Sequence, residues 1–465
     1  VVRVISPGTV LDDSLLDPKS PHYLVSVHFG RAGVGLAALD MSTGVFKVTE
    51  IQGEHAPTQL ADELEKLSPK EILVPETAAG GNGRSHPLPD EHDWFVHPRE
   101  DWTFSHAEAY RTLVEHFKTH SLEGFGCEDL RYAVSAGGAL IRYLRDTQKS
   151  ALKHINSIFT FHIHHSMLLD PTTVKSLELV QSSEGVRKNS LFHLLDLSQT
   201  PLGARRIRDW ILNPLIDRDA IVERLDRVEA FKENLLLRND LRKHLDRVYD
   251  LERLLGRIAL AACSPRDLAA LRASLETFPA LLALLQQGPE SVFSAYLQSW
   301  DPLEDVRARI DRTLVDDPPF HLKDGSLIKP GCHEELDRLQ RLRRDSKTWI
   351  ASLETQEKER TGIPVLKVGF NKIYGYYFEV TKKHLDRVPA EYLRKQSLVN
   401  AERFISPELK QYESEITSAE EKIQALELDL FQKLREAVAA EGSRIQHMAR
   451  MIGEIDALAA FAEAA

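Results

Sequence analysis

Two long stretches of helical periodicity, separated by about fifty residues that do not share it, constrain this chain more than any other feature. In residues 333–360 the apolar positions recur every three or four residues, at Leu336, Leu339, Leu342, Trp349, Ile350 and Leu353. In residues 412–440 they follow a near-heptad repeat, at Ile416, Ala419, Ile423, Leu426, Leu430 and Leu434. A near-heptad seam favours helices packed side by side, so we expect an antiparallel pair. At 1.5 Å per residue each arm would extend about 40 Å.

The segment between the arms, residues 362–411, is β-rich in pattern and basic. It holds nine Lys and Arg against five Asp and Glu, a balance of +4 in a chain whose formal net charge is −11. Seven aromatic residues are interleaved with these charges: Phe370, Tyr374, Tyr376, Tyr377, Phe378, Tyr392 and Phe404. A compact basic patch on an acidic protein favours a polyanionic partner such as duplex nucleic acid. A solvated hairpin with ordinary surface lysines, or a basic arm that binds an acidic protein, are the alternatives.

Composition sets wider bounds. A length of 465 residues predicts two to four domains, and 42% apolar with 28% charged residues is ordinary for a soluble protein. We expect no membrane span, no signal peptide and a cytoplasmic location. The first residue is not Met and the last residues stop inside a helical pattern, so we expect both ends to be cuts within a longer protein. Cys127, Cys263 and Cys332 form no CxxC pair, which argues against a disulfide framework or a cysteine zinc site.

The first 150 residues predict a mixed α/β domain. Residues 23–29, 34–39 and 45–51 have strand patterns, and helical patterns follow them. Asp40 ends a predicted strand, as metal-binding carboxylates do in ribonuclease-H-like nucleases. No second or third carboxylate is marked by spacing, so a turn role in Asp-Met-Ser-Thr-Gly is favoured.

Three histidines, His162, His164 and His165, lie together in the segment that follows. On a strand, His162 and His164 would share a face, but no carboxylate or Cys lies at ligand spacing, so a packed or edge strand is favoured over a metal site. From Ser166 onward, helical patterns punctuated by proline predict an irregular helical bundle. The expected fold class is therefore α+β and multidomain.

Longer segments carry a resemblance. LKVGFNKIYGYYFEV and YLRKQSLVNAERFISPELKQYE strongly resemble the clamp of the MutS family of bacterial DNA mismatch repair proteins. VVRVISPGTVLDDSLL, LDMSTGVF, LEGFGCEDL, YLRDTQKSALKHI, LDLSQTPLGARRIRDWILNPL and ACSPRDLAALR are similar to the same family in the same order. The resemblance covers essentially the whole chain.

This resemblance implies a domain map. Residues 1–150 would be a ribonuclease-H-like connector, 151–345 and 412–465 the core and lever helices, and 346–411 the clamp. It implies that a mismatch-reading domain precedes this chain and that an ATPase, which uses ATP and Mg, follows it. No G-x-x-x-x-G-K-[ST] motif is present, so we expect no ATP hydrolysis and no cofactor in this chain. The implied partners are duplex DNA, bound without sequence preference, MutL, and a second copy in a homodimer of the full-length protein.

The candidate DNA-binding residues come from two arguments. By resemblance, Asn371 and Asn400 fall at DNA-facing positions of the clamp. Charge and proximity add Lys372, Arg394, Lys395, Gln396 and Arg403. Val399 stands where relatives often carry Lys, which removes one potential phosphate partner. For Arg403 the competing interpretation is an ion pair with Glu402 or Glu408. Which connector residues would meet MutL, and whether this chain dimerises, stay open.

Overall fold

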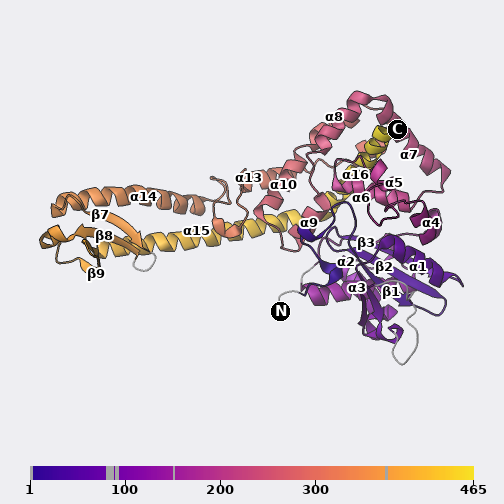
Figure 1. The fold of residues 1–465 in the computed structure, drawn as a ribbon, viewed down its shortest axis with the longest axis horizontal. Helices are drawn as coiled ribbons and strands as arrows, with labels where there is room; N and C mark the ends of the chain where they lie inside the picture. Colours follow the sequence, from indigo (N-terminus) through magenta and orange to yellow (C-terminus); the bar gives the residue numbers. More distant parts are fainter. Residues whose placement is uncertain (1–3, 80–87, 89–93, 150–151, 372–374) are drawn as a thin grey trace. The chain divides into compact units, whose positions relative to one another are not determined.

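The computed structural model of the chain describes residues 4–79, 88, 94–149, 152–371 and 375–465, with only the backbone for residues 342, 345–351, 412 and 415–417. The chain divides into two compact units (Figure 1). The first comprises Val1–Ile310 with Arg435–Ala465, and the second comprises Asp311–Leu434. Sheets and helices are both prominent, so the expected α+β class is confirmed.

A six-stranded mixed sheet occupies the N-terminal part of the first unit. Its strands are β1 (Tyr23–Phe29), β2 (Gly33–Asp40), β3 (Val45–Gln52), β4 (Glu71–Pro75), β5 (Val96–Arg99) and β6 (Phe159–Thr160). They lie in the order β5-β4-β1-β2-β3-β6. The first three strands form an antiparallel meander, and β4, β5 and β6 each add a parallel pairing. The alternating sequence patterns therefore located the meander correctly.

Three helices cover the two faces of this sheet: α1 (Ala56–Leu67), α2 (His106–Phe117) and α3 (Arg131–Gln148). Because strand side chains alternate in direction, Val25 and Leu36 pack with α1, whereas Leu24 and Leu39 pack with α2 and α3. A Cβ at Gly35 of β2 would lie 1.9 Å from the carbonyl oxygen of Tyr132 in α3. Only glycine at that position allows α3 to lie this close to the sheet.

Asp40 has the turn role expected from its sequence. Its buried carboxylate accepts hydrogen bonds from Ser42 N at 2.9 Å, Ser42 Oγ at 2.6 Å and Thr43 N at 3.4 Å. It also accepts one from His22 N at 2.9 Å. These bonds fix the β2–β3 connection, and the carboxylate of Asp40 is hydrogen-bonded to nearby residues of the protein.

The strand expected at the histidines is wrong. The chain leaves the sheet after Phe161, whose N–H donates to Val48 O at 3.0 Å, and residues Ile163–His165 form a 3-10 turn. Burial of Ile163 in the core beneath the sheet explains the turn, because an extended continuation would carry that side chain away. His162 instead meets His165 edge to face, with ring centroids 5.0 Å apart.

The helical bundle completes the first unit. Its helices are α4 (Pro171–Ser176), α5 (Leu191–Leu195), α6 (Pro201–Leu212), α7 (Arg218–Glu233), α8 (Leu235–Leu245), α9 (Leu251–Ala259), α10 (Pro265–Leu275), α11 (Phe278–Leu285), α12 (Glu290–Ser299), α13 (Glu304–Thr313) and α16 (Gly442–Ala464). The last of these, α16, is mostly buried and packs against α6, α7 and α9. Residues from the end of the chain therefore form the centre of the bundle.

A buried carboxylate joins α16 to the start of α6. Asp456 accepts hydrogen bonds from Gln199 N at 2.9 Å, Thr200 N at 2.7 Å and Thr200 Oγ1 at 2.6 Å. A Cβ at Gly203 would lie 2.3 Å from Asp456 Oδ2, so the close approach requires glycine. Burial raises the pKa of Asp456 to about 6, although these three donors favour its charged form.

One stretch among the described residues, Pro265–Leu285, has the length and apolar composition of a membrane-crossing helix. Here it forms two helices, α10 and α11, with Glu276 and Thr277 between them, and half of it is buried. Leu268, Leu271 and Phe278 are fully enclosed by the unit. This burial accounts for the apolar composition.

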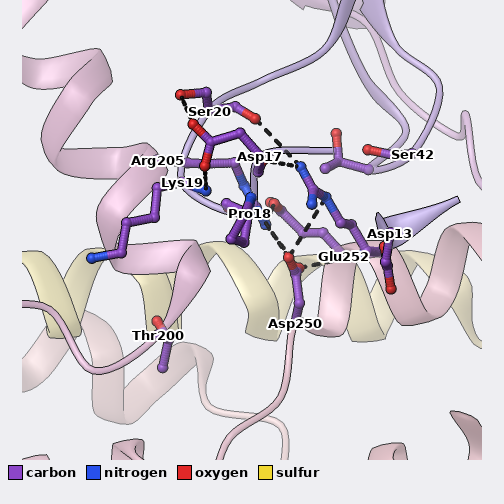
Figure 2. Close-up of polar contacts among 12 residues, drawn as sticks. Asp13, Asp17, Pro18, Lys19, Ser20, Ser42, Thr200, Arg205, Asp250 and Glu252 are labelled. Carbon is purple, nitrogen blue, oxygen red and sulfur yellow. Dashed lines mark hydrogen bonds and ion pairs between the residues drawn. The ribbon is translucent and has the colours of Figure 1, made fainter. Parts of the chain in front are cut away.

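A polar network fixes the N-terminal segment of the first unit to its helices (Figure 2). The guanidinium of Arg205 on α6 donates to Asp250 at 2.7 and 2.8 Å, to Glu252 at 2.7 Å and to the carbonyl of Pro18 at 2.9 Å. Arg253 on α9 donates to the carbonyl of Asp17 at 2.6 Å. Arg205 is buried but has three polar partners, Asp250, Glu252 and the Pro18 carbonyl, as a buried cation requires.

The second unit confirms the expected pair of long helices. Helix α14 (Glu334–Thr361) and helix α15 (Pro407–Ala440) lie side by side (Figure 1), and Gln340 donates to Glu427 between them at 3.3 Å. Of the predicted seam, Leu336, Leu339, Leu353, Ala419, Ile423 and Leu434 are buried. The side chains of Leu342, Trp349, Ile350 and Ile416 lie outside the described residues.

Candidate nucleic-acid interface

A four-stranded antiparallel sheet connects α14 to α15. Its strands are β7 (Lys367–Asn371), β8 (Gly375–Thr381), β9 (Leu393–Ser397) and β10 (Ala401–Ile405), in the order β7-β8-β10-β9. One face packs on the helices through Phe378, Val380 and Phe404, together with Leu353 of α14 and Leu409 of α15. Because side chains alternate along a strand, the other face is available for polar side chains. We call this four-stranded element the clamp sheet.

A row of polar residues crosses the outward face of the clamp sheet. Lys367 lies opposite Glu379, Glu379 opposite Arg403, and Arg403 opposite Gln396. Arg403 Nε donates to Glu379 Oε2 at 3.1 Å, and Arg403 NH1 donates to Gln396 Oε1 at 2.9 Å. The guanidinium also lies over the ring of Tyr377, 4.3 Å from its centroid. The structure therefore brings two predicted residues, Arg403 and Gln396, into direct contact.

Arg394 lies on the opposite face of the sheet from Arg403. The register shifts between Arg403 and Phe404, so Arg394 pairs with Phe404, whose side chain faces the helices. Arg394 NH1 is 3.5 Å from Glu402 Oε1, and Ser397 Oγ donates to the same oxygen at 3.3 Å. This bulge leaves Lys395 without a register partner and exposed at the edge strand.

The two predicted asparagines lie at opposite ends of the clamp sheet. Asn371 pairs with Gly375 at one end of β8. At the other end, the carbonyl of Asn400 accepts a hydrogen bond from Lys382 N at 3.1 Å. Lys382 follows Gly375 by seven positions of extended chain, which is about 23 Å at 3.3 Å per residue. Asn371 and Asn400 therefore cannot contact the same phosphate. Lys372, the remaining predicted residue, lies outside the described residues.

Charge on the clamp sheet is only partly neutralised. Arg403 and Arg394 are paired with carboxylates, whereas the side chains of five exposed lysines on or beside the sheet form no hydrogen bond or ion pair with any other described residue. Lys367 and Lys395 lie in strands of the sheet, Lys382 and Lys383 lie in the 3-10 helix that follows β8, and Lys410 lies in α15. Of these lysines the sequence predicted only Lys395 as a DNA-binding residue. The prediction used charge and position along the chain, and the sequence does not show which cations form ion pairs with carboxylates in the folded protein.

Buried polar contacts hold the clamp sheet on α14. Glu357 is 7% exposed and accepts hydrogen bonds from Arg360 and from the hydroxyl of Tyr392. Burial and this bond raise the pKa of Tyr392 above its usual range. Hydrogen bonds from Lys358 and from Val368 N lower the pKa of Glu354. Glu354 and Glu357 thus join the clamp sheet to α14 through hydrogen bonds to Val368 and Tyr392.

Comparison with known proteins agrees with this architecture. The family model described as MutS domain III matches residues 172–462, and that of MutS domain II matches residues 22–156. The first match alone covers more than half of the chain. The chain belongs to the MutS family.

Within the described residues no group of three or more His, Cys, Asp or Glu side chains is arranged to hold a metal ion.

Curated MutS proteins match the whole chain. The DNA mismatch repair protein MutS of Alkaliphilus metalliredigens is 42% identical over 100% of this chain and 53% of its own length. Those of Symbiobacterium thermophilum and Salinibacter ruber are 41% and 42% identical over all of this chain, and over 53% and 51% of their own lengths. The chain therefore spans about half the length of the MutS relatives it matches.

Proposed function

We propose that this chain is the connector, lever and clamp part of a DNA mismatch repair protein, and that the clamp sheet holds duplex DNA through its phosphates. One observation carries the proposal: exposed lysines that form no ion pair with a described carboxylate lie in and beside a small sheet that has one face packed on two paired helices. The +4 balance of residues 362–411 in an acidic chain supports the same partner.

Phosphate contacts suit this surface because they fix position without reading sequence. Lys395 offers a mobile point charge at the sheet edge. Gln396 and Asn400 offer amide donors, and Asn371 lies about 23 Å from Asn400 along the sheet. At about 3.4 Å per base pair, that span covers roughly seven base pairs, so the two ends would hold different phosphates.

The name of the MutS relatives, DNA mismatch repair protein, supplies the process. Within it, α14 and α15 would act as rigid levers between the clamp sheet and an ATPase, with MutL and a second MutS copy as partners. Because no Walker A motif occurs in the sequence, we expect no ATP hydrolysis by this chain on its own.

A second function, binding of an acidic protein, is favoured by one observation. Val399 is 87% exposed, and Phe370 and Leu393 are 60% and 61% exposed on or beside the same sheet. Exposed apolar side chains among cations are more typical of protein interfaces than of phosphate contacts.

Fluorescence anisotropy with matched and single-mismatch duplexes, titrated at several salt concentrations, tests the proposal. We expect weak binding that falls steeply with salt and is equal for the two duplexes. Lys395→Ala should weaken both equally, whereas Lys70→Ala, which removes an exposed lysine of the first unit, should change neither. Absence of binding at low salt, or retention of an acidic protein that duplex DNA does not displace, would overturn the phosphate interpretation.

A further inference from the structure

The first unit contains a cavity of about 520 Å³ outside the clamp sheet. Its walls come from β1, β3, β6, the β2–β3 turn and α1, and from the helices α6, α7, α9 and α16. Seven cationic and four anionic side chains line it. They are Lys47, Lys66, Arg205, Arg206, Arg208, Arg224 and Arg450 against Asp40, Glu63, Asp209 and Glu252. The described lining therefore carries an excess of three positive charges.

Three of the cations are neutralised within the protein. The pairs are Lys66–Glu63 at 2.8 Å, Lys47–Asp209 at 3.0 Å and Arg205–Glu252 at 2.7 Å. Asp40 is occupied by hydrogen bonds from its own turn. Each of the four lining carboxylates therefore already has a partner other than Arg208, Arg224 or Arg450.

Four arginines are left over. Arg206 NH1 reaches only to 4.0 Å from Asp209 Oδ2. Arg224 lies over the ring of Trp210, 3.8 Å from its centroid. Arg450 Nε donates to a backbone carbonyl at 3.4 Å. Within the described part of the chain, no carboxylate forms an ion pair with Arg208, Arg224 or Arg450.

Arg206, Arg208 and Arg224 are half-buried, whereas Arg450 is exposed. Burial lowers the pKa of Arg208, Arg224 and Arg450. At Arg224 the charge of Glu454 opposes this shift and that of Arg206 adds to it. At Arg450 the charge of Arg206 adds to the shift and that of Glu252 opposes it. Like charges from three helices therefore meet in a cavity where water screens them incompletely. Such an arrangement is unfavourable unless an anion enters, because a charge taken from water needs a partner.

We propose that Arg206, Arg208, Arg224 and Arg450 form a binding site for a nucleotide that carries two or more phosphate groups. Guanidinium groups bind phosphate through two parallel N–H···O bonds, and several convergent guanidinium groups require a multiply charged anion. The volume lies within the range of small-ligand sites. Phe159 lines the same cavity, is 59% exposed, and pairs in register with Lys47, so an aromatic ring is available to stack on a base.

Isothermal titration calorimetry of the 465-residue chain with ADP, pyrophosphate and inorganic phosphate, at fixed ionic strength, tests this site. ADP and pyrophosphate should bind, and inorganic phosphate should bind at least tenfold more weakly. Arg224→Gln and Arg450→Gln should each weaken ADP binding about tenfold or more, as expected for loss of charged hydrogen bonds. Arg218→Gln is the matched control, because Arg218 is an exposed arginine of α7 outside the cavity.

The variant Phe159→Ala distinguishes binding of the base from binding of the phosphate groups. It should weaken ADP several-fold and leave pyrophosphate unchanged. The melting temperature of each variant without ligand shows whether it folds, and Arg450→Gln, which disturbs no aromatic stack, keeps the test valid if Arg224→Gln unfolds.

Three results would overturn the site. The first is absence of heat and of any rise in melting temperature at millimolar ADP and pyrophosphate. The second is equal weakening by Arg218→Gln, which would mean non-specific attraction. The third is arginine-dependent binding of a ten-residue poly-glutamate peptide without binding of ADP, which would assign the cavity to an acidic protein segment.

Discussion

Arg403 donates a hydrogen bond to Glu379 at 3.1 Å across the clamp sheet, although the two residues are 24 positions apart in the sequence. The pair lies on the outward face, and the Tyr377 ring supports the guanidinium from below. Glu379 therefore holds the arginine along the sheet and cancels part of the charge that an approaching phosphate would meet.

Removing that carboxylate should strengthen DNA binding. In Glu379→Gln, Arg403 loses its ion pair and the outward face gains one net positive charge. We expect duplex affinity at low salt to rise about three- to tenfold and the salt slope to steepen by about one. Anisotropy titrations measure both quantities. Glu408→Gln makes the same charge change at an exposed residue of α15, outside the sheet face, so an equal gain there would show that only net charge matters.

Two neighbouring cations of β9 should respond differently to substitution. Lys395 has no described partner, so Lys395→Ala should reduce affinity uniformly across sequences and reduce the salt slope by about one. Arg394 is 3.5 Å from Glu402 on the face toward the helices, so Arg394→Ala should have the smaller effect. The slopes from titrations at four salt concentrations decide this. A larger effect at Arg394 would mean that DNA meets the other side of the sheet.

The ion-pair partners of Arg403 and Arg394 could not be predicted from the sequence. Glu402 and Glu408, close in sequence, were the expected partners of Arg403. In a strand, however, Glu402 points to the opposite face, and the residue beside Arg403 belongs to β8. The bulge then places Arg394 next to Glu402 instead. Pairing across strands depends on register, which local spacing does not reveal.

Long periodic segments were more predictable. The repeats around Leu336 and Ile423 each persist for several helical turns, so errors at single positions do not change the result. The short segment at His162 was mispredicted, because a few residues carry too little periodicity to separate a strand from a turn. The arginine cavity was not foreseen, since its residues come from helices more than 200 positions apart in sequence, such as those of Arg206 and Arg450.

Asp456 should make stability depend on pH. Burial raises its pKa in the folded state to about 6, from 3.8 in an exposed carboxyl. The folded state thus binds this proton more tightly, and its contribution is complete below pH 3.8 and lost as pH rises through 6. Relative to Asp456→Asn, which cannot titrate, the wild-type chain should lose about 1 kcal/mol of unfolding free energy between pH 5 and pH 7.5. Urea denaturation of both proteins at the two pH values measures this, and a gain in place of the loss would show that the hydrogen bonds outweigh burial.

Glu71 should be sensitive to loss of charge. It is fully buried and accepts hydrogen bonds from Gly8 N at 3.1 Å, His97 Nδ1 at 2.9 Å and Tyr143 OH at 2.8 Å, as well as from Ser6 Oγ. Glu71→Gln places an amide NH₂ among these donors and should lower the unfolding free energy by about 3 kcal/mol. Tyr143→Phe removes one donor and should lower it by about 1 kcal/mol. Urea denaturation compares them, and equal losses would mean that the charge of Glu71 contributes nothing.

The network around Arg205 makes the sharpest stability prediction. Arg205 is 8% exposed and bonds to both Asp250 and Glu252 (Figure 2). Although burial opposes it, this pairing lowers the pKa of Asp250, so the stability it contributes is present above pH 3.8 and lost as pH falls below that value. Arg205→Met leaves two buried carboxylates without their cation and should lower the unfolding free energy at pH 7 by about 3–5 kcal/mol. Arg206→Met, at the next position of the same helix, removes only a 4.0 Å ion pair with Asp209 and should be near neutral. Urea denaturation at pH 7 and pH 3 measures the free energy of unfolding of both proteins. The difference between wild type and Arg205→Met should be smaller at pH 3 than at pH 7. If the difference is the same at both pH values, the lost stability comes from packing of the aliphatic part of the arginine side chain.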